Sequence, residues 1–286
     1  MTHKKQHIVP ETYLKYFSPN EDGKKISVLS LQNRYSRKIK NYNSGDSIFW
    51  KKDYYNSKKI KNPKLLELFL GQKIETNYNN IVKKISDEIP FDDHDFKIRF
   101  FEYIFYSKLR SPVWRTFIKT IIDPQNPNKN NDPTNIKEEH LRLFFDSDVF
   151  ESVLKYYSDN LTFKKWNIII SSSEQLFISS DNPGFCFNYT DYQKNDKSFY
   201  KNPLWTNIQF DTLLYFPLTK KYCLLIEPYK KNDEINLNFS NDLIYYQSYD
   251  TEKIKIVNSW TVLTSNEYIF SSDRKELIEY ESILNS

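Results

Sequence analysis

The chain has 286 residues, of which 41 are basic and 37 are acidic, and its net charge is only +4. This near balance excludes a strongly basic coat for nucleic acid, although it allows a local basic patch. No segment approaches the roughly 18 apolar residues of a membrane span, and Cys186 and Cys223 lie apart in apolar stretches, so we expect a cytoplasmic protein with free thiols and no membrane partner.

The N-terminal part, residues 1–62, predicts a short helix and a small antiparallel sheet. Pro10 is followed by apolar residues at helical spacing, which indicates a helix over 11–18. Apolar runs bounded by turn residues then predict three strands. These strands span 26–31, 35–42 and 48–55.

The central part, residues 63–160, predicts a helical layer. Apolar residues recur at helical spacing for roughly five turns before a proline stops the pattern. Glu75 lies midway along this first helix, next to its apolar stripe, and a solvated helix face is its expected environment. The predicted helices span 63–90, 95–111 with Asp92 or Asp93 as its cap, and 135–157.

The C-terminal part, residues 161–286, predicts a mostly antiparallel sheet with closing helices. The predicted strands are 163–171, 176–180, 185–188, 212–216, 222–226, 243–246 and 268–270, and the predicted helices are 251–265 and 273 onward. The succession of strands, helices, strands and helices indicates a single α+β domain over 1–286 with segregated layers.

Two polar side chains that precede turn-forming prolines are candidate site residues. His7 precedes Pro10, and histidine titrates near neutrality, so it can act as general base, general acid or metal ligand. The alternative is a histidine that hydrogen-bonds a buried segment. Arg110 precedes Pro112, and its planar guanidinium suits a phosphate or a carboxylate. The alternative is an ion pair that closes the end of the helix.

Asp181 is the third candidate, at the end of an apolar strand and ahead of Pro183. A rigid strand can direct such a carboxylate towards catalysis or towards Mg²⁺. The alternative is an Asx-turn, in which Asp181 or Asn182 binds its own backbone. The other histidines stand in polar surroundings and are expected at the surface; they are His3, His94 and His140.

Five short motifs follow one another along the chain. They are His7-x-Val9-Pro10-x-x-Tyr13-Leu14-x-x-Phe17, Asp53-Tyr54-Tyr55, Leu109-Arg110-Ser111-Pro112, Ile178-Ser179-Ser180-Asp181-Asn182-Pro183 and Tyr215-Phe216-Pro217-Leu218. In this order they resemble the bacterial domain-of-unknown-function family 4238 over nearly the whole chain, with Ile8 in place of an aromatic residue that is common there. The resemblance implies a prokaryotic cytosolic protein, often encoded near mobile or defence genes, with no established activity.

Two classes of function are compatible with these residues. The first is a bacterial defence enzyme that cleaves a phosphodiester or a nucleotide, with His7 as general acid or base, Arg110 as anion clamp, and Asp181 as orienting carboxylate or Mg²⁺ ligand. Mg²⁺ is the one cofactor that this chemistry suggests, and the substrate-binding candidates are Tyr13, Asn182, Lys58 and Lys59. The alternative is a non-enzymatic module that binds nucleic acid or a partner protein through residues 189–207 and the Lys-rich segment 51–64.

The enzymatic hypothesis predicts that His7, Arg110 and Asp181 converge in one cleft between the helical layer and the C-terminal sheet. A binding surface would require many dispersed contacts, whereas this chain places a few polar groups beside backbone-fixing prolines. Pre-organised polar groups are what transition-state stabilisation requires.

Overall fold

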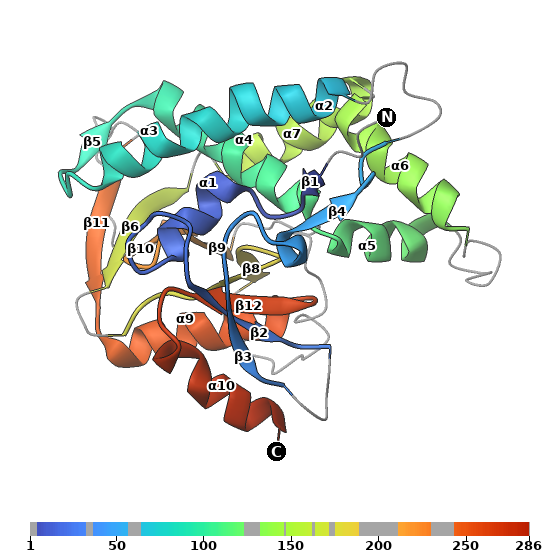
Figure 1. Ribbon diagram of the computed structural model, residues 1–286. Coiled ribbons are helices and arrows are strands. Elements are labelled where there is room, and N and C mark those ends of the chain that lie inside the picture. Colours follow the sequence, from blue (N-terminus) through green and yellow to red (C-terminus); the bar gives the residue numbers. More distant parts are fainter. Residues whose placement is uncertain are drawn as a thin grey trace.

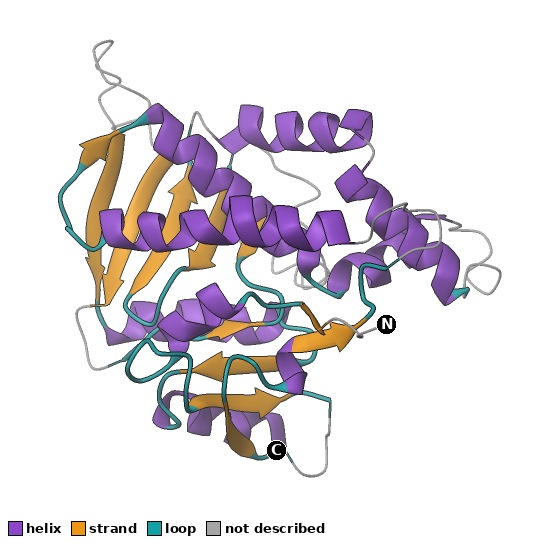
Figure 2. Cartoon of the chain, turned by 45° about the horizontal axis from the view of Figure 1, so that its top comes forward, coloured by secondary structure: helices purple, strands orange, loops and turns teal. Residues whose placement is uncertain are grey.

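The computed structural model describes residues 5–32, 37–56, 64–122, 132–145, 147–161, 164–171, 175–188, 211–229 and 243–285. Helices and strands segregate into separate layers, which confirms the predicted α+β class (Figure 1). The helical layer lies across one face of the larger sheet (Figure 2), and a C-terminal helix packs on the other face.

The N-terminal part forms two separate strand pairs. β1 (Lys5–His7) pairs with β4 (Trp50–Lys52), and β2 (Ile26–Ser30) pairs with β3 (Ile39–Tyr42), both antiparallel. The expected third strand over 48–55 is therefore only partly correct, because a 3₁₀ turn (Ser47–Phe49) precedes β4 and directs it to β1. The other edge of β2 is occupied by β12, so β4 does not pair with β2. The helix after Pro10 is α1 (Glu11–Leu14), which continues into a 3₁₀ turn (Lys15–Phe17).

The helical layer begins with one long helix that changes its winding. α2 (Lys64–Phe69) passes into a π-helical turn (Leu70–Glu75) and then into α3 (Thr76–Ile85). α4 (His94–Arg110) starts at the predicted cap, since the side chain of Asp93 accepts a hydrogen bond from the backbone N–H of Phe96. α5 (Val113–Ile122) follows Pro112. The single helix expected over 135–157 is instead two helices, α6 (Pro133–Phe145) and α7 (Ser147–Leu161), and α7 starts with Ser and Asp, which favour helix N-termini.

Among the described residues, the larger sheet has six strands in the order β5-β11-β6-β10-β9-β8. Of the strand pairs that the described residues form in this sheet, only β6–β11 is parallel. One face packs under α3 and α4, and the other packs on α9 (Thr251–Thr264). The strands are β5 (Phe91–Asp92), β6 (Lys165–Ser171), β8 (Phe185–Asn188), β9 (Thr212–Pro217), β10 (Tyr222–Glu227) and β11 (Leu243–Tyr249).

The smaller sheet, among the described residues, has four strands in the order β3-β2-β12-β7. β12 (Tyr268–Ser271) joins the N-terminal hairpin to β7 (Ser179–Ser180), and α10 (Lys275–Asn285) packs on this sheet. The N-terminal and C-terminal parts of the chain thus form one sheet, because an N-terminal hairpin pairs with C-terminal strands. No helix in the described part of the chain is long and apolar enough to cross a membrane.

Aromatic side chains fill the core where the three parts meet. Tyr13 of α1 lies 5.9 Å from Phe216 of β9 and 6.3 Å from Phe270 of β12, measured between ring centroids. Tyr78 of α3 stacks on Tyr103 of α4 at 4.2 Å. One hydrophobic cluster therefore includes residues from the N-terminal, helical and C-terminal parts. Both cysteines are free thiols.

Candidate functional site

His7 is the last residue of β1, directly opposite Trp50 in the β1–β4 pair. After it the chain bends at Pro10, whose extended backbone leads into α1, and Glu11 is the first residue of that helix. The Nε2 atom of His7 lies 3.0 Å from Oε1 of Glu11, close enough for an ion pair but without the alignment of a hydrogen bond. The side chain of His7 is 19 % exposed, but its Nε2 atom is buried, so the imidazole lies only partly at the surface.

The environment keeps the imidazole of His7 uncharged at neutral pH. Burial lowers the pKa of His7 below its ordinary value of 6.5, and the positive charges of Arg110 and Lys5 lower it further. Glu11 and Glu75 act in the opposite direction without overcoming this effect. A neutral imidazole is the form that can accept a proton, so His7 is suited to be a general base.

Arg110 is deeply buried and forms an ion pair with Glu75. The Nη1 atom of Arg110 lies 2.7 Å from Oε1 of Glu75, and the side chains are 2 % and 17 % exposed. The expectation that Glu75 lies on a solvated helix face is therefore wrong. Glu75 ends the π-helical turn, whose i→i+5 hydrogen bonds rotate the following side chains relative to an uninterrupted α-helix. Burial acts to lower the pKa of Arg110, but Glu75, Tyr55 and Glu67 hold it above its ordinary value.

Two polar atoms near this ion pair have no hydrogen-bond partner among the described residues. They are Nε of Arg110 and the hydroxyl oxygen of the fully buried Tyr55. Burial raises the pKa of Tyr55 well above 10, and Arg110 partly offsets this rise, which places the phenol within the field of the guanidinium. We call His7, Glu11, Tyr55, Glu75 and Arg110 the His7 cluster. Its outer members face solvent and its inner members have unsatisfied hydrogen-bonding capacity, as in a site for a polar ligand.

Asp181 has a different environment from the one expected. Asp181 is 1 % exposed, and its two carboxylate oxygens accept hydrogen bonds from the backbone N–H groups of Asn266 (3.0 Å) and Glu267 (2.9 Å). Burial raises the pKa of Asp181 to about 6 despite these bonds. The carboxylate thus caps the turn between α9 and β12, which differs from the local Asx-turn considered from the sequence. Within the described residues, no three His, Cys, Asp or Glu side chains gather in a group that could hold a metal ion.

The substrate-binding candidates that the structure describes are buried and bonded within the fold. The hydroxyl of Tyr13 donates to the carbonyl of Pro217 and contacts the hydroxyl of Ser179, each at 2.6 Å. The Nδ2 atom of Asn182 donates to the carbonyl of Thr264 at 2.8 Å. These residues connect the sequence motifs to each other, and this geometry favours a structural role for both. Lys58, Lys59 and the segment 189–207 lie outside the described residues.

The C-terminal end of α4 is where the motifs meet. The Nζ atom of Lys108 donates to the carbonyls of Pro183 (3.3 Å) and Gly184 (2.7 Å), so α4 contacts the turn that follows Asp181. Arg110, one residue beyond Leu109, reaches the His7 cluster instead. The structure therefore brings His7 and Arg110 into one cluster with Glu11 and Glu75, and it directs the carboxylate of Asp181 to another turn.

His140 was expected at the surface, and this expectation is wrong, whereas His94 is exposed as predicted. His140 of α6 is fully buried, its Nε2 lies 2.7 Å from the carbonyl of Leu109, and its Nδ1 accepts from Nε of Arg115 at 3.3 Å. Burial and the charge of Arg115 lower the pKa of His140 to about 3. The polar residues around it in the sequence concealed this role, because its partners come from α4 and α5.

Replacing His140 with glutamine is expected to make the protein less sensitive to acid. The unfolded chain protonates His140 below pH 6.5, whereas the folded chain does not until about pH 3, so its contribution to stability is present above pH 6.5 and is lost as the pH falls. Between pH 6.5 and 4.5 the wild type should lose about 2–3 kcal/mol relative to His140→Gln. Urea unfolding at both pH values measures this difference, and His94→Gln is the exposed control. If the free energies of unfolding of the wild type and of His140→Gln differ by the same amount at both pH values, His140 is protonated in the folded protein.

Comparison with known proteins gives one match. The family described as "Protein of unknown function (DUF4238)" matches residues 5–275. No curated protein and no solved structure matches the chain. The matched region contains the whole of the His7 cluster and every motif that connects it to the sheets.

Proposed function

This chain belongs to the DUF4238 family of proteins of unknown function, and from that premise we propose that it is a bacterial defence enzyme that cleaves a phosphodiester or nucleotide substrate at the His7 cluster. The observation that carries the proposal is the arrangement of His7 and Glu11 at the surface above the buried Arg110–Glu75 pair. A partly exposed proton-accepting group with a fixed charge beneath it is suited to hydrolysis of a polar substrate.

Each member of the cluster has a role in this proposal. His7 takes a proton from the attacking water, and Glu11 orients the imidazole and stabilises its protonated form. Arg110 offers its Nε–H to a substrate oxygen, and Glu75 fixes the guanidinium in place. The cytoplasm is the proposed location. We also propose to test whether Mg²⁺ is required and whether the protein is instead a non-enzymatic binding module.

Substitution of His7 with alanine is expected to lower kcat at least about 100-fold, because general-base catalysis contributes a factor of this order. The purified protein is incubated with RNA, with single- and double-stranded DNA and with nucleotides, each with and without Mg²⁺, and products are separated by chromatography. Activity of the wild type should fall on acidification below pH 6.5, since the pKa of His7 lies below that value.

His94→Ala provides the control, because this exposed histidine lies at the start of α4. It should retain wild-type activity, and both variants should retain the wild-type melting temperature. If no substrate is cleaved and His7→Ala keeps full biological activity in cells, the enzymatic proposal is wrong and the binding module takes its place. Loss of the fold in His7→Ala would instead show that His7 is structural.

A further inference from the structure

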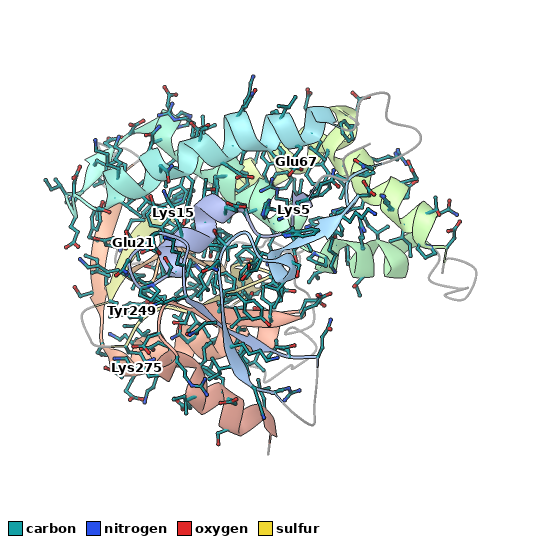
Figure 3. All side chains as sticks on the ribbon, in the orientation of Figure 1. Lys5, Lys15, Glu21, Glu67, Tyr249 and Lys275 are labelled. Atoms are coloured by element: carbon teal, nitrogen blue, oxygen red, sulfur yellow. The ribbon has the colours of Figure 1, made fainter. Side chains whose placement is uncertain are left out.

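A cavity of about 220 Å³ lies between α9 and the larger sheet, where it is lined by side chains of β8, β9, β11 and α9. This is the face of the sheet opposite the helical layer, so the cavity is separate from the His7 cluster. Tyr249, labelled in Figure 3, lines it at the end of β11, and Ile256 of α9, which is 57 % exposed, lies where it opens to solvent. An apolar cavity of about 150 Å³ is large enough to bind benzene. This cavity can therefore hold an aromatic ring with a small substituent.

Four aromatic rings in the lining are nearly parallel. Alternate residues of a strand share one face, so Phe185 and Phe187 of β8 lie on the same side, and Tyr215 of β9 is the register partner of Phe185. The ring centroids of Phe185 and Tyr215 are 5.2 Å apart, and those of Phe187 and Trp260 of α9 are 5.3 Å apart. The stacked pairs among these rings have interplanar angles from 11° to 23°. A flat ring can extend such a stack, whereas an aromatic cage for an ammonium group needs ring faces directed at one point from different sides.

Among the described residues that line the cavity, the charged one is Lys253. Its Nζ atom lies 5.4 Å from the centre of the Tyr249 ring, which places the ammonium group beside the aromatic lining. Lys253 also pairs with Asp250 at 3.9 Å, but both side chains are more than half exposed, so this ion pair contributes little. The carboxylate of Asp250 already accepts a hydrogen bond from the backbone N–H of Lys253 at the start of α9. The charge of the lining therefore repels a cationic ligand and attracts an anionic one.

The polar groups of the lining favour a ring with few polar atoms. The hydroxyls of Tyr215 and Tyr249 lie 3.4 Å apart and bond to each other. A nucleobase has several donors and acceptors on its edge, and each of them loses a hydrogen bond to water when it is buried without a partner. A phenyl or indole ring does not have this cost, or has it for one atom only.

We propose that this cavity binds a small aromatic acid, with its apolar ring against the stacked rings and its carboxylate on Lys253 at the rim. The ligand is a free small molecule, because the cavity holds one substituted ring. This binding site is independent of the proposed hydrolytic function, since no member of the His7 cluster lines the cavity.

The test uses three probes that share one ring and differ in charge: indole-3-acetate, indole and tryptamine. Isothermal titration calorimetry of the purified full chain measures each affinity. We expect indole-3-acetate to bind at least about tenfold more tightly than tryptamine, because an ion pair with Lys253 replaces a repulsion. Lys253→Gln should weaken binding of indole-3-acetate about tenfold and leave binding of indole unchanged. Phe187→Leu, which removes one ring and keeps an apolar side chain, should weaken binding of both ligands.

Lys255→Gln is the matched control and should leave all affinities unchanged. Lys255 also lies on α9 and pairs with an acidic residue, Glu252 at 3.8 Å, but it does not line the cavity. An unchanged affinity of Lys253→Gln for indole-3-acetate, or tighter binding of tryptamine, would overturn the proposal. Tighter binding of AMP than of indole-3-acetate would overturn it in favour of a nucleotide site. Binding of an acidic tryptophan-containing peptide without binding of indole-3-acetate would overturn it in favour of a partner protein, and absence of binding by all three probes would overturn it outright.

Discussion

Replacing Glu75 with alanine is expected to lower the free energy of unfolding by roughly 3–5 kcal/mol, the range for breaking a buried ion pair on one side. The guanidinium of Arg110 is 2 % exposed and lies 2.7 Å from the carboxylate of Glu75. Arginine does not lose its proton in a protein, so the variant must bury a positive charge whose nearest counter-ion has been removed. Chemical denaturation at neutral pH measures the loss.

A surface ion pair provides the control for this prediction. Glu139 lies 2.9 Å from Arg142 on α6, with side chains 41 % and 56 % exposed, and Glu139→Ala should cost no more than about 1 kcal/mol. Combining Glu75→Leu with Arg110→Met should recover much of the lost stability, because similar-sized apolar residues often replace a buried pair without net cost. Equal effects of Glu75→Ala and Glu139→Ala would show that groups other than Glu75, such as Glu67, compensate the charge of Arg110.

The fold class could be predicted from the sequence because periodicity is a local property. The helix after Asp93 and the strands 185–188 and 212–217 follow from apolar spacing and from capping chemistry that neighbours in the chain determine. Strand pairing is not local, and β4 shows the consequence. Its residues have strand character, but the choice of β1 as its partner depends on β12 occupying the edge of β2.

The candidate site could be predicted only where a proline fixes the backbone next to a polar side chain. His7 and Arg110 have this signature, and they lie in one cluster. Glu75 has no such signature, because a π-helical turn decides which way its side chain points and no residue pattern in the chain marks that turn. The expectation of a surface position for His140 was wrong for a related reason, since its environment depends on Leu109 and Arg115, which belong to other helices.

Asp181 shows how a polar residue beside a proline can serve the fold instead of a reaction. Its two carboxylate oxygens accept hydrogen bonds from the backbone N–H groups of Asn266 and Glu267, in a partly buried turn. An unsatisfied buried N–H costs about 1–3 kcal/mol. The sequence showed a carboxylate at a strand end, but it could not show that a turn some 85 residues later supplies the donors.

Replacing Asp181 with alanine is expected to destabilise the protein more strongly at pH 4.5 than at pH 8. Burial raises the pKa of Asp181 to about 6 from 3.8, so the folded chain takes up a proton before the unfolded chain does. Stability contributed by Asp181 therefore rises as the pH falls through 6. The difference between the two pH values should be about 2 kcal/mol, on top of the loss of the two hydrogen bonds. Guanidinium unfolding of both proteins at each pH measures it.

Asp250→Ala separates the loss of a hydrogen-bond acceptor from the effect of burial. Asp250 also accepts a backbone N–H, that of Lys253 at 3.0 Å, but at the exposed start of α9, and its removal should cost about 1 kcal/mol. If the destabilisation by Asp181→Ala instead becomes smaller on acidification, the carboxylate is favoured in its ionised form and must have a positive partner in the fold. A buried, ionised Asp181 would then be available to orient a base or bind a cation, and it would return to the candidate site.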